Sequence, residues 1–392
     1  MNVPLLDLKA QYKSLKKEID ETLIRVAESQ YFILGPDVDR LEADICDYTG
    51  AKRAIGVSSG TDALLLALMA LDIRPGDEVI VPTYSFFATA GVVARLNAIP
   101  VFVDSDPVTF NIDPKQVELA ITEKTKAIVP VHLYGQSADM DEIMAISKKH
   151  NLFVVEDGAQ AIGVEYKDGR QVGTIGTIGC FSFFPSKNLG GFGDGGVVTT
   201  MDEQLAEKLK IMRVHGGHPK YYHKMIGGNF RLDALQAAVL SVKLPHLNSW
   251  SAKRRENAEL YTKLFVKLGL AEKTGLTEFD NYNKVLLPKA VYKDTTGLNN
   301  YHIYNQFIIR VEKRDELINH LRQKSIGCEI YYPVPFHKQE CFNYLMENPF
   351  YKKINFANAD FAAEHSLALP IYPELTEEQI RYVVNSIKEF IG

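Results

Sequence analysis

Lys187 is the residue whose setting most clearly suggests chemistry. It lies in the segment 179–196, GCFSFFPSKNLGGFGDGG, where an apolar run is followed by a polar turn and closely spaced glycines. Aromatic and small neighbours disfavour the charged ammonium, which lowers the pKa of a lysine and makes its amine nucleophilic. Glycines also allow the backbone to approach a bulky ligand closely. Taken alone, the segment fits an exposed lysine in a glycine-rich loop better, because most lysines are solvated.

Asp157, at the end of the apolar run in the segment 152–160 (LFVVEDGAQ), is a second candidate. An acid at the C-terminal end of a buried parallel strand faces the crevice in which α/β sheets bind ligands. Such an acid can keep a pyridinium nitrogen protonated, so that a ring cofactor serves as an electron sink. The same residue also fits a cap on the following helix.

The segment 55–64, IGVSSGTDAL, has the order of strand, turn and helix that is typical of an anion site. The first turn of a helix presents free N–H groups and the positive end of the helix dipole, which suits a phosphate group. The segment has neither the spacing of a P-loop nor that of a dinucleotide-binding loop. Ordinary helix capping by Ser59 or Thr61 is the alternative.

An aromatic cluster in the segment 82–90, PTYSFFATA, falls at another junction between a strand and a helix. One of these rings could stack on a planar cofactor, whereas a place in the core is the more common fate of Tyr84, Phe86 and Phe87. The phosphate turn, the aromatic cluster, the acid and the lysine follow one another in a single α/β pattern. Their combination, more than any one of them, predicts a phosphate-bearing ring cofactor at one edge of a sheet.

Apolar runs that alternate with helical patterns between residues 50 and 200 predict the elements that position these residues. Buried strands separated by helices indicate a mostly parallel sheet covered on both faces, with its ligand site beyond the C-terminal ends of the strands. Strands are expected at 54–57, 78–82, 101–104, 127–132, 152–156 and 179–183.

The last third of the chain predicts a second, smaller α/β domain. A charged, helix-like stretch at 247–268 connects it to the first, which suggests a large domain at 1–250 and a small one at 251–392. In the small domain we expect strands at 304–311 and 328–332 and helices at 314–324 and 376–391, the last capped by Thr376. A polar N-terminal helix at about 8–29 is expected on the surface or at a subunit interface.

Composition narrows the class of protein. The 392 residues are 46% hydrophobic and carry a net charge of −5, without the clustered basic face of a nucleic-acid-binding protein. We see neither a signal peptide nor an apolar run long enough for a membrane span. The four cysteines are too far apart to suggest disulfides or a metal site, so a reducing, cytoplasmic location is the simplest interpretation; they are Cys46, Cys180, Cys328 and Cys341.

Over nearly its whole length the sequence resembles the sugar aminotransferase family named after DegT and StrS, within the fold-type-I enzymes that use pyridoxal 5′-phosphate (PLP). The resemblance is carried by PLLD at 4–7, LGP at 34–36, SSGTDAL, EDGAQA and FPSKNLGGFGDGG, and further by GNFRLDALQ at 228–236, YPVPFHKQ at 332–339 and LP at 369–370. It implies an aspartate-aminotransferase-like fold with a mostly parallel central sheet and a smaller C-terminal α/β domain.

The resemblance also implies a role for particular residues. Lys187 matches the catalytic lysine that forms the Schiff base with PLP, and Asp157 matches the partner of the pyridine nitrogen. Phe86 and Ala159 match the residues that cover the two faces of the ring, and Gln160 matches a residue near its hydroxyl group. The phosphate contacts are matched by Gly60, Thr61 and Ser182, together with Asn229, which in this family reaches the site of the neighbouring subunit. The positions near the substrate are matched by Arg231, His337 and Tyr332.

The activity that the resemblance implies is transfer of an amino group from Glu to a nucleotide-linked keto sugar, with pyridoxamine 5′-phosphate as the intermediate form of the cofactor and 2-oxoglutarate as a product. The segment around Lys187 resembles the branch that aminates C3, and UDP-2-acetamido-3-keto-glucose is favoured, as a step toward lipopolysaccharide or another surface polysaccharide. A shared-site homodimer is expected, without nucleic-acid, membrane or metal partners.

Several alternatives stay open. A dTDP-3-keto-6-deoxyhexose or a 4-keto sugar could replace the favoured substrate. A PLP-dependent sugar dehydratase is disfavoured because that branch of the family replaces the lysine with histidine. A PLP enzyme of amino-acid metabolism shares the fold but not the whole set of motifs. A regulator without catalysis would be expected to lose Lys187 or Asp157, and both are present.

Overall fold

A mostly parallel β-sheet forms the centre of the computed structural model, which describes residues 1–282, 284–352 and 354–392. Within these residues seven strands follow the order β1-β7-β6-β5-β4-β2-β3. Only β7 runs antiparallel to its neighbours, β1 and β6. The strands are β1 (Arg53–Val57), β2 (Glu78–Pro82), β3 (Ile99–Val103), β4 (Thr125–Ile128), β5 (Phe153–Asp157), β6 (Ile178–Ser182) and β7 (Gly196–Thr200).

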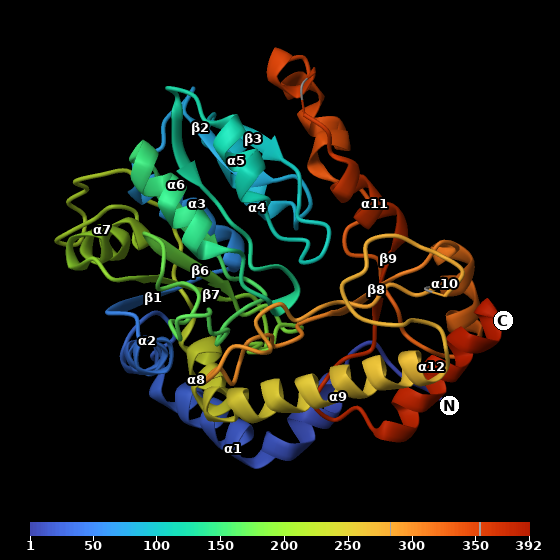
Figure 1. Cartoon of the computed structure of the whole chain (residues 1–392). Coiled ribbons are helices and arrows are strands. Elements are labelled where there is room, and N and C mark those ends of the chain that lie inside the picture. Colours follow the sequence, from blue (N-terminus) through green and yellow to red (C-terminus); the bar gives the residue numbers. More distant parts are fainter. Residues whose placement is uncertain (283, 353) are drawn as a thin grey trace.

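Helices cover both faces of this sheet (Figure 1). One face packs on α3 (Gly60–Ala70), α4 (Ala88–Arg95) and α7 (Glu203–Arg213). The other face packs on α2 (Pro36–Thr49), α8 (Ala234–Lys243), α5 (Pro114–Ala120) and α6 (Met140–His150). Because both faces are covered, nearly all strand residues are buried and most of them are apolar, as expected of a parallel sheet. The α/β class and the mostly parallel sheet are thereby confirmed.

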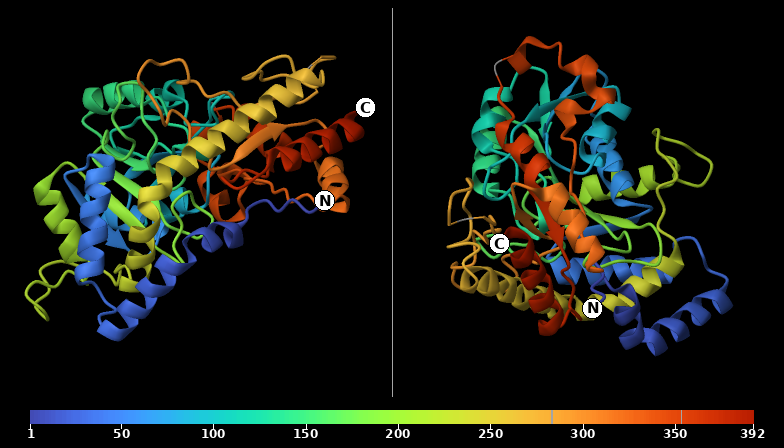
Figure 2. Two further views of the ribbon diagram at one scale, coloured as in Figure 1. Left: turned by 90° about the horizontal axis from the view of Figure 1, so that it is seen from below. Right: turned by 90° about the vertical axis from the view of Figure 1, so that its right-hand side faces the viewer.

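A smaller unit is built on the antiparallel pair β8 (Phe307–Arg310) and β9 (Ser366–Leu369). The long helix α9 (Leu247–Lys267) runs from the large sheet to this unit, where it shares a core with α10 (Arg314–Gln323) and α12 (Glu377–Ile391) (Figure 2). The expected capping box is present, since Thr376 accepts a hydrogen bond from the Gln379 backbone and the Gln379 side chain accepts one from Thr376.

The N-terminal segment joins the two parts of the chain. Val3 is fully buried in the core of the smaller unit, and α1 (Leu8–Ser29) then packs against α8 of the larger one. The division at residue 250 stays a prediction. The expected strand at 328–332 is wrong: this segment makes only an isolated bridge, Glu329 with Ala368, and the strand that pairs with β8 is β9. Residues 336–345 return to the large sheet, where Phe336 and Phe342 enter its core.

The helices found in the described ranges are too short or too polar to span a lipid bilayer.

Glu156 anchors the loops at the centre of the sheet. It is fully buried on β5, and its carboxylate accepts hydrogen bonds from the backbone N–H groups of Gly173, Ile175 and Gly176 at 2.6–2.8 Å. His132 lies 2.9 Å from the same carboxylate through Nε2. Its Nδ1 accepts a hydrogen bond from the Ala138 backbone, so the ring proton is on Nε2 and is donated to Glu156. The buried charge is satisfied entirely by donors, as burial requires.

Replacing Glu156 by Gln is expected to lower the free energy of unfolding by about 2–4 kcal/mol, because an amide NH₂ faces N–H donors and leaves them unpaired. Chemical denaturation measures the loss. Glu118→Gln is the matched control: Glu118 pairs at the surface with Lys149 and His150, and its replacement is expected to change stability far less, because water screens the exposed pair. Similar small losses in both variants would contradict the anchoring role.

Candidate active site

The residues singled out in the sequence meet where the strands end. β1 leads into the turn before α3, β2 into the aromatic segment, and β5 and β6 end at Asp157 and Ser182. A Cβ added to Gly60 would lie 2.7 Å from the Ser182 side chain, so the turn after β1 lies directly against the end of β6. Parallel topology places these ends on one edge of the sheet, where ligands bind in such folds.

The Asp157 carboxylate is almost completely buried and has a fixed orientation. Oδ2 accepts a hydrogen bond from the Thr89 hydroxyl at 2.8 Å, and Oδ1 accepts one from the Ala159 backbone at 3.1 Å. Burial raises the pKa of Asp157, while these two hydrogen bonds and the nearby Lys187 charge oppose that rise. The hydrogen-bonded carboxylate can accept a further donor, such as a protonated ring nitrogen.

Lys187 lies on the hairpin loop that joins β6 to the antiparallel β7. A turn closes in front of it, with the Lys187 backbone N–H bonded to the Phe184 carbonyl at 2.8 Å. The side chain keeps some exposure to solvent, yet the surrounding protein lowers the pKa of Lys187 to about 8, and Asp157 partly offsets this effect. Roughly a tenth of such an amine is uncharged at pH 7, far more than for an ordinary lysine, and the uncharged form is the nucleophile.

The turn before α3 has the geometry of an anion cradle. The Ser59 side chain caps α3 by accepting a hydrogen bond from the Asp62 backbone at 3.0 Å. The first-turn N–H groups around Gly60 and Thr61 have no partner within the helix and lie at the positive end of its dipole. The close approach of Gly60 to Ser182 leaves no room for a side chain there. Helix capping and anion binding were alternatives in the sequence analysis, but one turn can do both. Ser59 caps the Asp62 N–H, while the N–H groups around Gly60 and Thr61 are left for an anion.

The aromatic segment after β2 divides between core and surface. Tyr84 is fully buried and donates a hydrogen bond to the Tyr331 carbonyl. Phe87 stacks on Phe342 with ring centroids 5.6 Å apart. Phe86 is 58% exposed, with its ring centroid 6.3 Å from that of Tyr332. Phe87 is itself 46% exposed, so Phe86 is the more exposed of the two phenylalanines and the one that lies beside Tyr332.

Gln160 links the end of β5 to the segment that follows residue 330. Its Oε1 accepts a hydrogen bond from the Tyr134 backbone at 2.6 Å, and its Nε2 donates to the Tyr332 hydroxyl at 3.0 Å. The Tyr332 ring also lies close to those of Tyr84 and Phe86. The structure therefore places Tyr332 beside Gln160 and Phe86, at the same edge of the sheet.

His337 lies beside this region, but both of its ring nitrogens have protein partners. Nδ1 is 2.9 Å from the Thr83 hydroxyl, and Nε2 is 3.1 Å from the Asp360 carboxylate. The ring stacks on Phe356 at 4.2 Å. Burial lowers the pKa of His337. A role for His337 toward substrate stays a prediction.

Asn229 and Arg231 line an open cavity of about 600 Å³ beside Ser58 and Ser59. Arg231 pairs with Val57 through a backbone bridge. Among the described residues, its buried Nε has no hydrogen-bond partner. A buried guanidinium N–H without a partner is suited to an anionic ligand.

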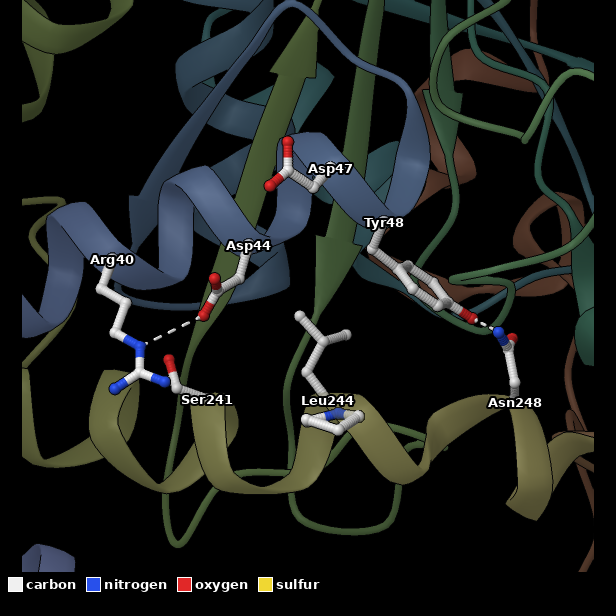
Figure 3. A pocket seen from close by; sticks show the side chains of 8 residues that line it. Arg40, Asp44, Asp47, Tyr48, Ser241, Leu244 and Asn248 are labelled. Carbon is white, nitrogen blue, oxygen red and sulfur yellow. Dashed lines mark hydrogen bonds and ion pairs between the residues drawn. The ribbon is translucent and has the colours of Figure 1, made fainter.

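Another hollow, of about 380 Å³, lies between α2 and the stretch that runs from α8 to the start of α9 (Figure 3). Within α2, Arg40 pairs with Asp44 at 3.6 Å. Across the hollow, the Tyr48 hydroxyl donates a hydrogen bond to Asn248 of α9 at 2.8 Å. The side chains that line this hollow, as far as the structure describes them, include none of the residues predicted to act in catalysis or binding. The candidate site is therefore the edge that carries Asp157 and Lys187.

Two contacts of this site were not anticipated from the sequence. Thr89, which is fully buried on α4, holds Asp157. The Tyr134 backbone, in a short turn after β4, holds Gln160. The signal for Thr89 was its position in the aromatic segment, one helical turn after Ser85. No local pattern marks Tyr134, because its contact depends on tertiary structure.

The sheet topology and the lysine–aspartate pair at its edge define the class of protein, a fold-type-I α/β enzyme. Residues 13–388 match the model of the DegT/DnrJ/EryC1/StrS aminotransferase family, and the chain belongs to this family. The resemblance inferred from the motifs is thereby confirmed.

Individual relatives align over nearly the whole chain. A protein named "Pleiotropic regulatory protein" from Geobacillus stearothermophilus is 52% identical, covering 100% of this chain and 99% of its own. UDP-N-acetyl-3-dehydro-alpha-D-glucosamine 3-aminotransferase from Acidithiobacillus ferrooxidans is 42% identical over 98% of this chain and 97% of its own. dTDP-3-amino-3,4,6-trideoxy-alpha-D-glucose transaminase from Streptomyces venezuelae is 41% identical, with 99% and 96% covered.

Solved structures agree in fold. DesV from S. venezuelae, in complex with a ketimine intermediate, superposes with a TM-score of 0.88 at 39% identity, covering 99% of this chain and 98% of its own. NtdA from Bacillus subtilis, with the bound cofactor pyridoxamine phosphate (PMP), superposes with a TM-score of 0.86 at 31% identity, covering 99% and 85%. The protein is an enzyme of the aminotransferase class.

The lowered pKa of Lys187 predicts a specific pH dependence of stability in the cofactor-free protein. Between the native value of about 8 and the unfolded value of 10.5, the unfolded chain holds more protons, so the free energy of unfolding rises with pH. Relative to Lys187→Met, the natural protein is expected to gain about 2–3 kcal/mol from about pH 7 to about pH 10. Denaturant titrations across this range measure the difference.

Lys17→Met is the control for this experiment, because Lys17 is an exposed residue of α1. Its stability difference from the natural protein is expected to stay constant with pH. Parallel curves for Lys187→Met and the natural protein would show that the Lys187 amine is solvated in the fold.

Proposed function

We propose that this protein is a PLP-dependent aminotransferase that transfers the amino group of Glu to C3 of a nucleotide-linked 3-keto sugar. The observation that carries the proposal is the convergence of Lys187, Asp157 and the Ser59 turn on one sheet edge in a chain of this aminotransferase family. UDP-2-acetamido-3-keto-glucose is the favoured substrate.

The residues at this edge fit PLP. Asp157 is buried and held by two donors, so it presents an oriented carboxylate to a ring nitrogen. The Gly60–Ser182 contact forms a tight cradle beside the first turn of α3, where Gly60, Thr61 and Ser182 would hold a phosphate. When bound, PLP supplies the electron sink that stabilises negative charge at the donor's Cα.

Lys187 holds the cofactor and moves the proton in this proposal. Its Nζ is the attachment point for the cofactor aldehyde. Once an amino donor has freed it, the same nitrogen would accept the proton from the donor's Cα and would serve as the proton donor afterward. A pKa of about 8 suits both tasks, because Nζ can be neutral when it accepts the proton and charged afterward. The donor would give up its amino group in the first half of the reaction, and the sugar would receive it in the second half. Lys187 would move the proton in both halves, in opposite directions.

Other side chains orient the ring and the substrate. Phe86 would stack on one face of the ring and Ala159 would cover the other, with Gln160 near the ring hydroxyl. Arg231 would meet the diphosphate of the nucleotide, because its buried Nε is free of protein partners. Tyr332 and His337 would contact the sugar, and of these Tyr332 has the more direct support, since it lies against Phe86 and Gln160.

The relatives' names support a keto-sugar substrate but differ in the nucleotide. The A. ferrooxidans relative is named for a UDP-linked sugar and for the 3-position, and the S. venezuelae relative for a dTDP-linked 3-amino sugar. A dTDP-linked 3-keto-6-deoxyhexose is therefore the second candidate, and 4-keto sugars are the third. A PLP-dependent sugar dehydratase is less favoured, since Lys187 is present.

The regulatory name of the G. stearothermophilus relative favours a separate possibility, a regulator that keeps the fold. Lys187 has a lowered pKa and Asp157 is held by hydrogen bonds, and both features argue against this possibility because a non-catalytic protein needs neither.

We also propose a cytoplasmic location and a role in surface polysaccharide synthesis. The proposed domains are residues 1–250 and 251–392.

A homodimer with shared sites is part of the proposal. The hairpin that precedes Asn229 projects from the body of the chain in both views of Figure 2. It exposes Tyr221, Tyr222 and Ile226 by 71–86%, which suits burial against a second copy. We propose that Asn229 of one chain reaches the cofactor phosphate bound to the other.

Supplying Glu with 3-keto and 4-keto nucleotide sugars is expected to yield an amine at C3 of the 3-keto substrate, located by NMR. Lys187→Ala is expected to lower turnover by about a thousandfold or more, because it removes the proton-transferring amine. Lys17→Ala, at an exposed position, should keep full activity. An amine at C4 would contradict the regiochemistry, and full activity of Lys187→Ala would contradict the role of Lys187.

Mixing Lys187→Ala chains with Asn229→Asp chains tests the shared site. If Asn229 acts in the partner's site, each hybrid dimer has one intact site, and random mixing restores about a quarter of the natural activity. Each variant alone is the control and should be nearly inactive. If the mixture stays as inactive as its components, Asn229 serves the site of its own chain.

A further inference from the structure

Three side chains form a buried hydrogen-bonded chain that ends on Asp157. The Ser85 hydroxyl lies 3.1 Å from the Thr89 hydroxyl, which lies 2.8 Å from Oδ2 of Asp157. All three residues are at most 4% exposed. Ser85 precedes α4 and Thr89 lies in its first turn, so one short segment after β2 reaches across to the end of β5.

The direction of this chain follows from the charge of its last member. An ionised carboxylate only accepts hydrogen bonds, so Thr89 must donate to Asp157. A hydroxyl has a single proton, so Thr89 can only accept from Ser85, which must be the donor in that contact. The chain therefore has one proton arrangement while Asp157 is charged, and each donor strengthens the next.

Thr89 departs from the usual behaviour of threonine in a helix. A helical threonine commonly bonds to a backbone carbonyl one turn earlier. Here the hydroxyl proton is directed to a carboxylate on another element. Because the site is closed to water around Thr89, loss of this hydroxyl would leave Oδ2 of Asp157 without a replacement donor.

We propose that Thr89, oriented by Ser85, is a positioning residue that holds Oδ2 of Asp157 so that the carboxylate meets the ring nitrogen of the cofactor. The inference rests on the proposed function, in which PLP and PMP occupy this edge. Thr89 would contact neither the cofactor nor the substrate, and it acts through its hydrogen bond to Asp157. The hydrogen bond to Thr89 is also the largest effect opposing the rise in the pKa of Asp157 on burial.

The test compares binding of two probes to the cofactor-free protein. PMP has a ring nitrogen, and its 1-deaza analogue has a C–H in that place. Both bind without a covalent bond to Lys187. Thr89→Val keeps the shape of the side chain and removes the donor. Thr89→Val is expected to weaken the binding of PMP by about tenfold to a hundredfold, because a hydrogen bond to a charged group usually has an effect of this size. Binding of the deaza analogue should change by less than about twofold, since it makes no bond to Asp157.

Two further variants keep the inference testable. Thr89→Ser restores the donor and should bind PMP within about threefold of the natural protein. Ser85→Ala should weaken PMP more than the analogue, by a smaller factor than Thr89→Val, and it decides the question if Thr89→Val does not fold. Thr49→Val, which removes a buried hydroxyl bonded within α2, is the matched control and should leave both affinities unchanged.

Asp157→Asn separates this inference from the proposed function. It should abolish the preference for PMP over the deaza analogue. If Asp157→Asn keeps that preference, the proposed cofactor contact is wrong. Suppose instead that Asp157→Asn loses the preference for PMP. If Thr89→Val then keeps this preference, or weakens the binding of both probes equally, only the role of Thr89 is overturned.

Discussion

Two adjacent buried carboxylates on the central strand β5 are the constraint on which the rest of the site depends. Side chains alternate along a strand, so Glu156 and Asp157 point to opposite faces of the sheet. Glu156 is satisfied by three backbone N–H groups and His132, which fixes the loop before β6. Asp157 has only Thr89 and Ala159 as donors and keeps capacity for another. One charge is thus used to hold the fold, and its neighbour remains available to a ligand.

The antiparallel strand β7 explains how Lys187 comes to face Asp157. A parallel neighbour would require a long crossover connection, whereas an antiparallel one needs only a loop. The chain can therefore leave β6, present Lys187 at the edge where β5 ends, and return through β7. Because this loop is packed around the lysine, burial lowers the pKa of the amine more than the attraction of Asp157 raises it. The same fold thus produces both the proximity and the reactivity.

Features set by local sequence were predicted well, and features set by distant contacts were not. The periodicity of α9 and the capping box at Thr376 follow from neighbouring residues, and both are present. Parallel topology brings strand ends together, and the structure places Asp157 and Lys187 at the same edge of the sheet. β9 was missed because its partner, β8, is far away in the sequence. Thr89 was missed because its position one turn after Ser85 does not indicate which distant carboxylate its hydroxyl meets, and that contact depends on how α4 packs against β5.

The segment after β2 shows how a single element can hold both Asp157 and the segment 331–337. Thr83 and Tyr84 hold residues 331–337 through hydrogen bonds to His337 and Tyr331. Ser85 and Thr89 hold Asp157, and Phe86 between them stays exposed. Since the two sets of bonds use different side chains, the 331–337 segment can change in sequence without disturbing the carboxylate. In the proposed function, such a separation would let one cofactor geometry accept differently shaped sugars, because the reacting carbon would stay fixed while the contacts around it vary.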